Sequence, residues 1–169
     1  MIDWLYSKIG VMVASLIFLS SFIAIFSAMN ESLRDNQASV LADRIAETID
    51  NVYSTQGEVV ATISTYESGE NMSLPGTIIG EEYGVRIFYD TVWIVRLHDA
   101  DRPWAFAPLH NHVITCKPVR SGCPGQDISD AEQMSRVVGL LINPIDLFHV
   151  ERRQVLLSGI TSYLTFVYS

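Results

Sequence analysis

Residues 9–29 read IGVMVASLIFLSSFIAIFSAM, a stretch of 21 residues without a charged side chain or a proline. An α-helix rises about 1.5 Å per residue, so a helix of this length spans roughly 30 Å, the thickness of a bilayer's hydrocarbon core. Hydrocarbon offers no partner to free backbone N–H and C=O groups, so the stretch must be helical in lipid. A secretory signal peptide has a shorter apolar core of about 7–15 residues and a small-residue cleavage site, which Asn30–Arg34 lacks. We therefore predict a retained membrane anchor over residues 9–29.

Small residues recur along this anchor and suggest a surface for helix assembly. Small side chains let helix backbones approach closely, and hydroxyl groups can form hydrogen bonds between helices in lipid. Such residues are also ordinary in any membrane helix, so specific packing and simple residence in lipid both stay open. The positions that we expect to take part in assembly are Gly10, Ala14, Leu16, Ser20, Ala24 and Ala28.

The helix is expected to continue beyond the anchor. Residues 1–8 form a short leader with aromatic residues suited to the membrane interface, and residues 30–55 form an amphipathic continuation. One helical face of the continuation carries apolar side chains, and Gly57 stands in a stop position. These features predict one helix of about 45–50 residues that ends near Tyr53. The apolar residues of the face are Leu33, Val40, Leu41, Ile45, Ile49 and Val52.

From residue 56 to residue 169 the sequence predicts a β domain. Strands are expected at 58–67, 83–89, 92–98 and 112–119 and in the tail 155–168, with 83–98 forming a hairpin. Residues 99–108 are expected to form a loop, because their two prolines and their acids exclude a central strand. Residues 127–141 begin like a capped helix and then become β-branched, which leaves helix and strand open. The predicted fold class is α+β, a long N-terminal transmembrane helix followed by a predominantly antiparallel, sandwich-like β domain.

Charge and cysteine content indicate where this domain resides. The formal net charge of −8 argues against a nucleic-acid partner, which would favour a basic face. Cys116 and Cys123 lie close together in the turn-rich segment TCKPVRSGC, which indicates a small disulfide in an oxidising compartment. Two N-x-S sequons place candidate glycosylation sites at Asn30 and Asn71. We therefore expect a cell-surface protein with its β domain outside the cell.

Candidate chemistry is sparse. His110, His112, Cys116 and Cys123 could form a tetrahedral zinc site, but the Cys-x6-Cys spacing is wider than that of paired zinc ligands. We therefore favour a disulfide and surface histidines. The acidic pair Asp99 and Asp101 lacks the repeated ligand series of a calcium loop. The sequence also lacks a G-x-S-x-G motif, a phosphate-binding glycine loop and an H-E-x-x-H motif. We expect no metal, no cofactor and no enzymatic activity.

The layout resembles that of archaeal type IV pilin-like proteins, a superfamily of pilins, archaellins and accessory subunits of the archaellum motor. The resemblance is one of layout, covers about the first half of the chain, and is carried by residues 10–29, by ASVLADRI at 38–45 and by Leu74-Pro75 leading to 80–83. The sequence departs from that superfamily near its N-terminus. Lys8-Ile9-Gly10 only approximates a processing site in which a basic residue directly precedes glycine or alanine. Asp3 stands in for the early glutamate of many bacterial pilins.

The resemblance implies a mechanical role, in which N-terminal helices bundle as a hydrophobic core and β domains coat the outside. We expect a subunit of a surface filament that serves adhesion or a related purpose, a helical homo-oligomer held together through its N-terminal helix. The alternative is a membrane-resident accessory protein, stator-like, whose β domain binds the S-layer or another cell-surface ligand. A membrane-tethered enzyme or metal-binding domain is the least supported hypothesis.

Overall fold

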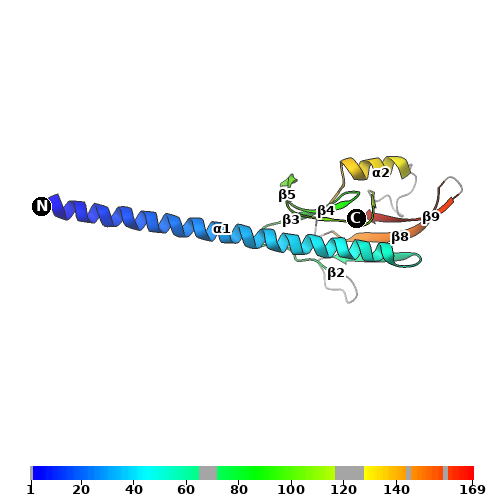
Figure 1. The fold of residues 1–169 in the computed structure, drawn as a ribbon, viewed down its shortest axis with the longest axis horizontal. Helices are drawn as coiled ribbons and strands as arrows, with labels where there is room; N and C mark the ends of the chain where they lie inside the picture. Colours follow the sequence, from blue (N-terminus) through cyan, green and yellow to red (C-terminus); the bar gives the residue numbers. More distant parts are fainter. Residues whose placement is uncertain (1, 65–71, 117–127, 144–145, 158–159) are drawn as a thin grey trace. The chain divides into compact units, whose positions relative to one another are not determined.

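The computed structural model describes residues 2–64, 72–116, 128–143, 146–157 and 160–169. Its first element, α1, runs from Ile2 to Ser54 and includes 53 residues, which confirms the predicted long helix (Figure 1). Gly57, just after the helix, has a φ of 98°, a conformation that glycine adopts without steric strain. The chain divides into two compact units, Met1–Arg34 and Asp35–Ser169. The fold is α+β, as the sequence predicted.

The second unit contains a five-stranded sheet. Its spatial order is β2 (Met72–Ser73), β1 (Val59–Ser64), β8 (Phe148–Leu157), β9 (Ile160–Tyr168) and β6 (Ile114–Thr115). The central pairs β1–β8 and β8–β9 are antiparallel, whereas the short edge strands β2 and β6 pair in parallel with their neighbours. The long β8–β9 hairpin therefore forms the middle of this sheet.

A four-stranded sheet forms the second layer of strands. Its order is β5 (Asp99–Pro108), β4 (Thr91–Arg96), β3 (Tyr83–Ile87) and β7 (Leu140–Ile142). All its neighbouring strands are antiparallel. The register of β3 and β4 runs from Tyr83 opposite Arg96 to Ile87 opposite Val92, which confirms the predicted hairpin.

The second half of α1 and residues of both sheets share one hydrophobic core. Four of the predicted apolar helix residues are buried in it, namely Leu41, Ile45, Ile49 and Val52. The other two, Leu33 and Val40, are each 49% exposed. Three alanines that the periodicity did not single out, Ala38, Ala42 and Ala46, are buried beside the four. Their small side chains let the helix backbone pack closely on the strands.

Residues 99–108 correct one prediction. They form strand β5, not a loop. The exclusion of a central strand holds, because β5 is an edge strand of its sheet. Edge strands accept proline because one side of the strand needs no ladder hydrogen bonds, and the register of β4 with β5 shifts beside the Val95–Pro103 pair.

Other strand bounds also differ from prediction. Strand β6 covers Ile114–Thr115, which is shorter than the expected 112–119, although residues 117–119 lie outside the described part of the chain. Strand β8 begins at Phe148, before the expected start of the closing strands at residue 155. The alternating pattern that would predict this strand is weakened by three consecutive polar residues, Arg152, Arg153 and Gln154.

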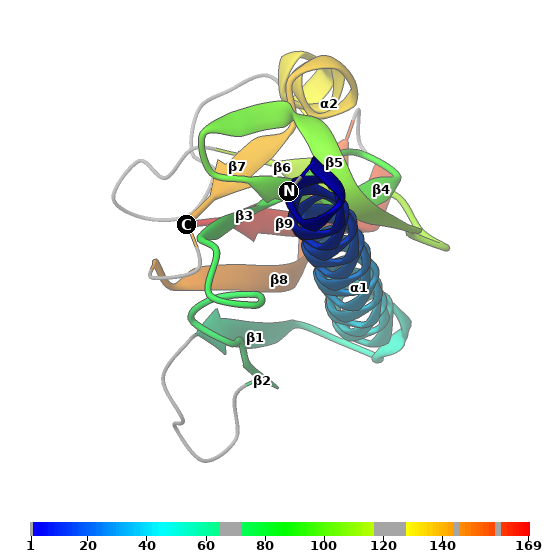
Figure 2. The same ribbon diagram turned by 90° about the vertical axis from the view of Figure 1, so that its left-hand side faces the viewer.

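The ambiguous segment 127–141 resolves into helix α2 (Ile128–Val137) followed by β7. Gly139 separates them with a φ of 65°, and a Cβ at this position would lie 2.8 Å from the carbonyl oxygen of Ile87. The buried Ser135 hydroxyl accepts a hydrogen bond from the Thr115 backbone N–H at 2.8 Å. This contact fixes α2 against β6, beside the strands (Figures 1 and 2).

Candidate functional site: an exposed apolar helix and a polar pocket

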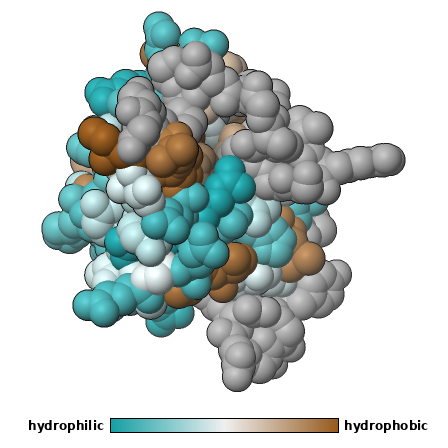
Figure 3. Space-filling model, turned by 90° about the vertical axis from the view of Figure 1, so that its right-hand side faces the viewer, coloured by the Kyte–Doolittle hydropathy of each residue, from teal (hydrophilic) through white to brown (hydrophobic). Residues whose placement is uncertain are grey.

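The first half of α1 exposes an apolar surface along its whole described length. All residues from 6 to 33 are exposed, and the large apolar side chains between residues 9 and 29 range from 49% exposed at Ile9 to 70% at Phe18. By length and composition this helix qualifies as a membrane span. The exposed face of the second unit in Figure 3 is different, with hydrophobic patches separated by hydrophilic residues. The helix is therefore a candidate membrane anchor.

The predicted assembly residues do not all share one face of the helix. Successive helical residues are about 100° apart around the axis, so Gly10, Ala14, Ala24 and Ala28 fall within about 40° of one line. Ser20 and Leu16 lie about 80° and 120° from that line. A Cβ added at Gly10 would meet no other atom within 4 Å, so the small face is open to a neighbour.

A row of phenylalanines lies about 120° around the helix from this small face. The ring centroids of Phe18 and Phe22 are 5.9 Å apart, and those of Phe22 and Phe26 are 6.5 Å apart. Nearby serine hydroxyls donate to carbonyls of their own helix, for example Ser21 to Ile17 at 2.8 Å and Ser15 to Val11 at 2.8 Å. These bonds satisfy the hydroxyl donors without water, as a hydrocarbon environment requires.

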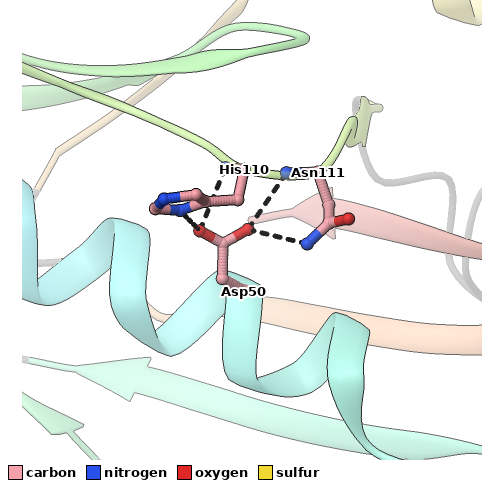
Figure 4. A network of polar contacts seen from close by, with 3 residues as sticks. All are labelled: Asp50, His110 and Asn111. Carbon is pink, nitrogen blue, oxygen red and sulfur yellow. Dashed lines mark hydrogen bonds and ion pairs between the residues drawn. The ribbon is translucent and has the colours of Figure 1, made fainter.

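In the second unit, the Asp50 carboxylate binds the segment between β5 and β6. Asp50 Oδ2 accepts from the backbone N–H of His110 at 3.1 Å and lies 2.9 Å from His110 Nδ1. Asp50 Oδ1 accepts from the backbone N–H and side-chain Nδ2 of Asn111 at 3.2 and 3.3 Å (Figure 4). We call these three residues the carboxylate clamp. Sequence reasoning gave Asp50 no role, since its pairing depends on a contact across 60 residues.

A pocket of about 370 Å³ lies beside the clamp. We call it the tyrosine pocket; its lining residues include Tyr53, Tyr89, Tyr163, His110, Asn111 and Thr165. Two further lining residues, His112 and Glu132, come from the β5–β6 segment and from α2. Sequence reasoning missed this pocket, because its residues come together only through the pairing of distant segments.

An electrostatic cluster forms one wall of the tyrosine pocket. The Tyr89 ring stacks on His112 with centroids 4.3 Å apart, and the Arg136 guanidinium lies 4.0 Å from the Tyr89 centroid. Arg136 also donates to Glu132 at 2.8 Å, which lowers the pKa of Glu132 and raises that of Arg136. Burial, followed by the charge of Glu132, raises the pKa of Tyr89. The cluster therefore holds a paired acid and base and a neutral phenol at neutral pH.

The residues considered as a possible zinc site, which the sequence did not favour, contact different partners in the described part of the chain. His110 contacts Asp50, whereas His112 stacks on Tyr89. Among the described residues, no group of three His, Cys, Asp or Glu side chains is placed to hold a metal ion. Of the acidic pair Asp99 and Asp101, Asp101 lies 3.1 Å from Arg86 and its side chain is 95% exposed.

The remaining predicted sites are partly outside the described residues. Cys116 is buried, and Cys123 lies in the segment 117–127, which is outside the described residues, so their pairing stays a prediction. Asn30 is exposed on α1, and Asn71 also lies outside the described residues. Glycosylation at either position stays a prediction.

No protein-family model, curated protein or solved structure matches this chain.

Proposed function

We propose that this protein is a structural subunit of a type IV pilus-like surface filament, assembled through residues 9–29 of α1. The observation that carries the proposal is the continuous exposure of apolar side chains along this helix. Each large apolar side chain transferred from water into an apolar environment gains about 1.5–3 kcal/mol. A helix with so many of them is stable only in lipid or among other helices.

Several features favour assembly in addition to anchoring. The small face at Gly10, Ala14, Ala24 and Ala28 permits close approach of a second helix. Residues 35–54 continue the same helix, and their apolar side chains belong to the core of the β domain. The apolar segment and the domain are therefore parts of one continuous helix-containing chain. The proposed orientation places the acidic β domain outside the cell, where Cys116 and Cys123 would form a disulfide. In this proposal the protein is not an enzyme.

Imaging of purified material tests the proposal directly. Long fibres in negative stain support a filament subunit. Discrete particles that require detergent support the alternative, a membrane-resident accessory protein that binds an S-layer or another surface ligand. Mass spectrometry of the N-terminus adds a second criterion, because an intact leader favours the resident protein.

A matched pair of variants tests the small face. Ala24→Leu adds bulk on that face, and Ser15→Leu adds similar bulk about 180° around the helix. Close packing on the small face predicts that Ala24→Leu weakens self-association about tenfold or more, whereas Ser15→Leu has a smaller effect. Equal effects of the two substitutions would contradict packing through this face.

A further inference from the structure

The floor of the tyrosine pocket contains a buried hydroxyl without a partner. Thr165 is 1% exposed and lines the pocket, and its Oγ1 has no hydrogen-bond partner among the described residues. Arg152 is the direct cross-strand partner of Thr165, and its buried Nε likewise has no partner among the described residues. Buried polar atoms are nearly always hydrogen-bonded in folded proteins. Of the two residues, Thr165 lines the pocket, so its hydroxyl marks a place that favours a polar ligand atom.

One face of β9 runs from the hydrophobic core to the exposed end of the tyrosine pocket. Residues two apart on a strand share a face, so Tyr163, Thr165 and Val167 of β9 point to the same side. Val167 is part of the hydrophobic core, Thr165 two residues before it is buried, and Tyr163 is 42% exposed. The face therefore changes from apolar core to polar floor to an accessible aromatic ring.

The Arg152 guanidinium contacts two of the pocket's aromatic rings. Its guanidinium carbon lies 5.0 Å from the ring centroid of Tyr163 and 5.4 Å from that of Tyr53. Its Nη1 donates to the backbone carbonyls of Tyr53 and Thr55. These contacts hold the two tyrosines in place before a ligand arrives.

The carboxylate clamp presents polar atoms at the pocket wall. His110 Nδ1 and Asn111 Nδ2 face Asp50, so the other ring nitrogen of His110 and the amide oxygen of Asn111 point away from the carboxylate (Figure 4). The His110 ring contacts Asp50 through Nδ1, which leaves Nε2 as its second polar atom. Both residues line the pocket and contribute polar atoms to its wall.

Charge around the pocket disfavours an ionic ligand. The described lining residues include no lysine or arginine, and the lining carboxylate of Glu132 is paired with Arg136. An anion would lie near the Asp50 and Glu132 carboxylates, whose charges offset the attraction of the Arg136 and Arg152 guanidiniums beside the tyrosine rings. A cation would meet tyrosine rings that already contact the guanidiniums of Arg136 and Arg152. A neutral ligand avoids both conflicts.

We propose that the tyrosine pocket binds a neutral sugar residue. Sugar hydroxyls both donate and accept, which matches the Thr165 hydroxyl and the polar side chains of Asn111 and His110 in the lining. The C–H face of a sugar ring packs on aromatic surface such as Tyr163. The volume of about 370 Å³ lies within the range of small-molecule sites. The sugar is either a free ligand or part of a surface glycan, and this proposal is independent of filament formation.

The test uses the intact chain in lipid nanodiscs, since glycoside detergents would themselves supply sugar. Saturation-transfer NMR with neutral hexoses and N-acetylhexosamines is expected to detect binding of at least one sugar in the millimolar range. Inorganic phosphate and tetramethylammonium serve as anionic and cationic probes. Binding of neither ion is expected to match that of the sugar. Lack of binding by every neutral sugar, or stronger binding of either ion, would overturn the proposal.

Three variants locate the binding site. Tyr163→Ala is expected to weaken sugar binding about tenfold, because it removes the accessible aromatic face. Thr165→Val keeps the side-chain shape, removes the unpartnered hydroxyl, and is expected to weaken binding without lowering the unfolding midpoint. Phe106→Ala, at an exposed aromatic of the other sheet, should leave binding unchanged. Unchanged binding in both pocket variants would overturn the assignment.

A second arm distinguishes the two sources of the sugar. Equal affinity for a free monosaccharide and for the same sugar within an immobilised oligosaccharide indicates a small free ligand. Tighter binding of the oligosaccharide indicates a surface glycan. Both results support the shared chemistry, whereas retention on the oligosaccharide that persists in Tyr163→Ala contradicts it.

Discussion

Asp50 and His110 are 60 residues apart in the sequence, yet the Asp50 carboxylate lies 3.1 Å from the backbone nitrogen of His110 and 2.9 Å from its Nδ1. The Asp50 side chain is 16% exposed, so its charge is largely removed from water and depends on these donors. The contact ties the end of α1 to the segment that leads into β6. Two residues held by Asp50, namely His110 and Asn111, form part of the wall of the tyrosine pocket.

Asp50→Asn is expected to lower the free energy of unfolding by about 1–3 kcal/mol, because hydrogen bonds to a charged acceptor are lost or weakened. The measurement is urea unfolding of the intact protein, followed by near-UV circular dichroism. Asp43→Asn, at an exposed position of the same helix, is the matched control and should change stability by less than about 0.5 kcal/mol. Equal effects of the two substitutions would show that the clamp contributes nothing.

Tyr83 is expected to make stability depend on alkaline pH. Its ring is buried, its hydroxyl donates to the Pro75 carbonyl at 2.6 Å, and burial raises its pKa above the usual value. A raised folded-state pKa contributes stability below about pH 10, and that stability is lost as pH rises toward the folded-state pKa. Wild-type protein should therefore lose stability steeply between about pH 10 and 12.

Tyr83→Phe separates this effect from other groups that titrate in the same range. The variant should be about 1 kcal/mol less stable at pH 8, because one hydrogen bond is lost. Its stability should fall less steeply at high pH, with Tyr89 and Tyr168 still titrating in both proteins. Parallel pH profiles of the two proteins, measured by urea unfolding, would contradict this account.

Ile79 is a strained position that substitution should relieve. It is a β-branched residue with a φ of 51°, followed by Gly80 with a φ of 76°, in a turn closed by the bridge between Ile78 and Glu81. Two successive positive φ angles are typical of a type I′ turn, which favours Asn-Gly. Ile79→Asn is expected to raise the free energy of unfolding by about 1 kcal/mol. A lower thermal midpoint in the variant would contradict the turn assignment.

The predicted disulfide between Cys116 and Cys123 is tested chemically. A thiol assay on the native intact protein should find no free thiol, and reduction should release two. Cys123→Ser should lower the free energy of unfolding by about 2–3 kcal/mol without abolishing folding, because the enclosed loop is short. Two reactive thiols in the native protein would remove the prediction.

The sequence predicts local features well and long-range features poorly. The helix from Ile2 to Ser54 and the β3–β4 hairpin depend on periodicities within one segment, and both are confirmed. The role of Ala38, Ala42 and Ala46 was missed because alanine carries little hydrophobic signal, although its small size suits close packing on strands. Strand β5 was missed because proline disfavours strands in general, while edge position is a property of the assembled sheet.

Of the two candidate sites, one could be predicted from local sequence and the other could not. The apolar helix is evident from composition alone, since 21 uncharged residues have few other environments. The tyrosine pocket combines α1, α2, β9 and the β5–β6 segment, and no short-range pattern records that combination. Thr165 gives no sequence signal either, because its burial and its unpartnered hydroxyl depend on the folded surroundings of β9.

Sedimentation of the intact protein in detergent-free buffer most directly tests whether the exposed helix requires lipid or other helices. We expect the protein to pellet with membranes or as filaments, and to become dispersed only when detergent is added. A freely soluble monomer without detergent would contradict both the filament and the membrane-resident proposals.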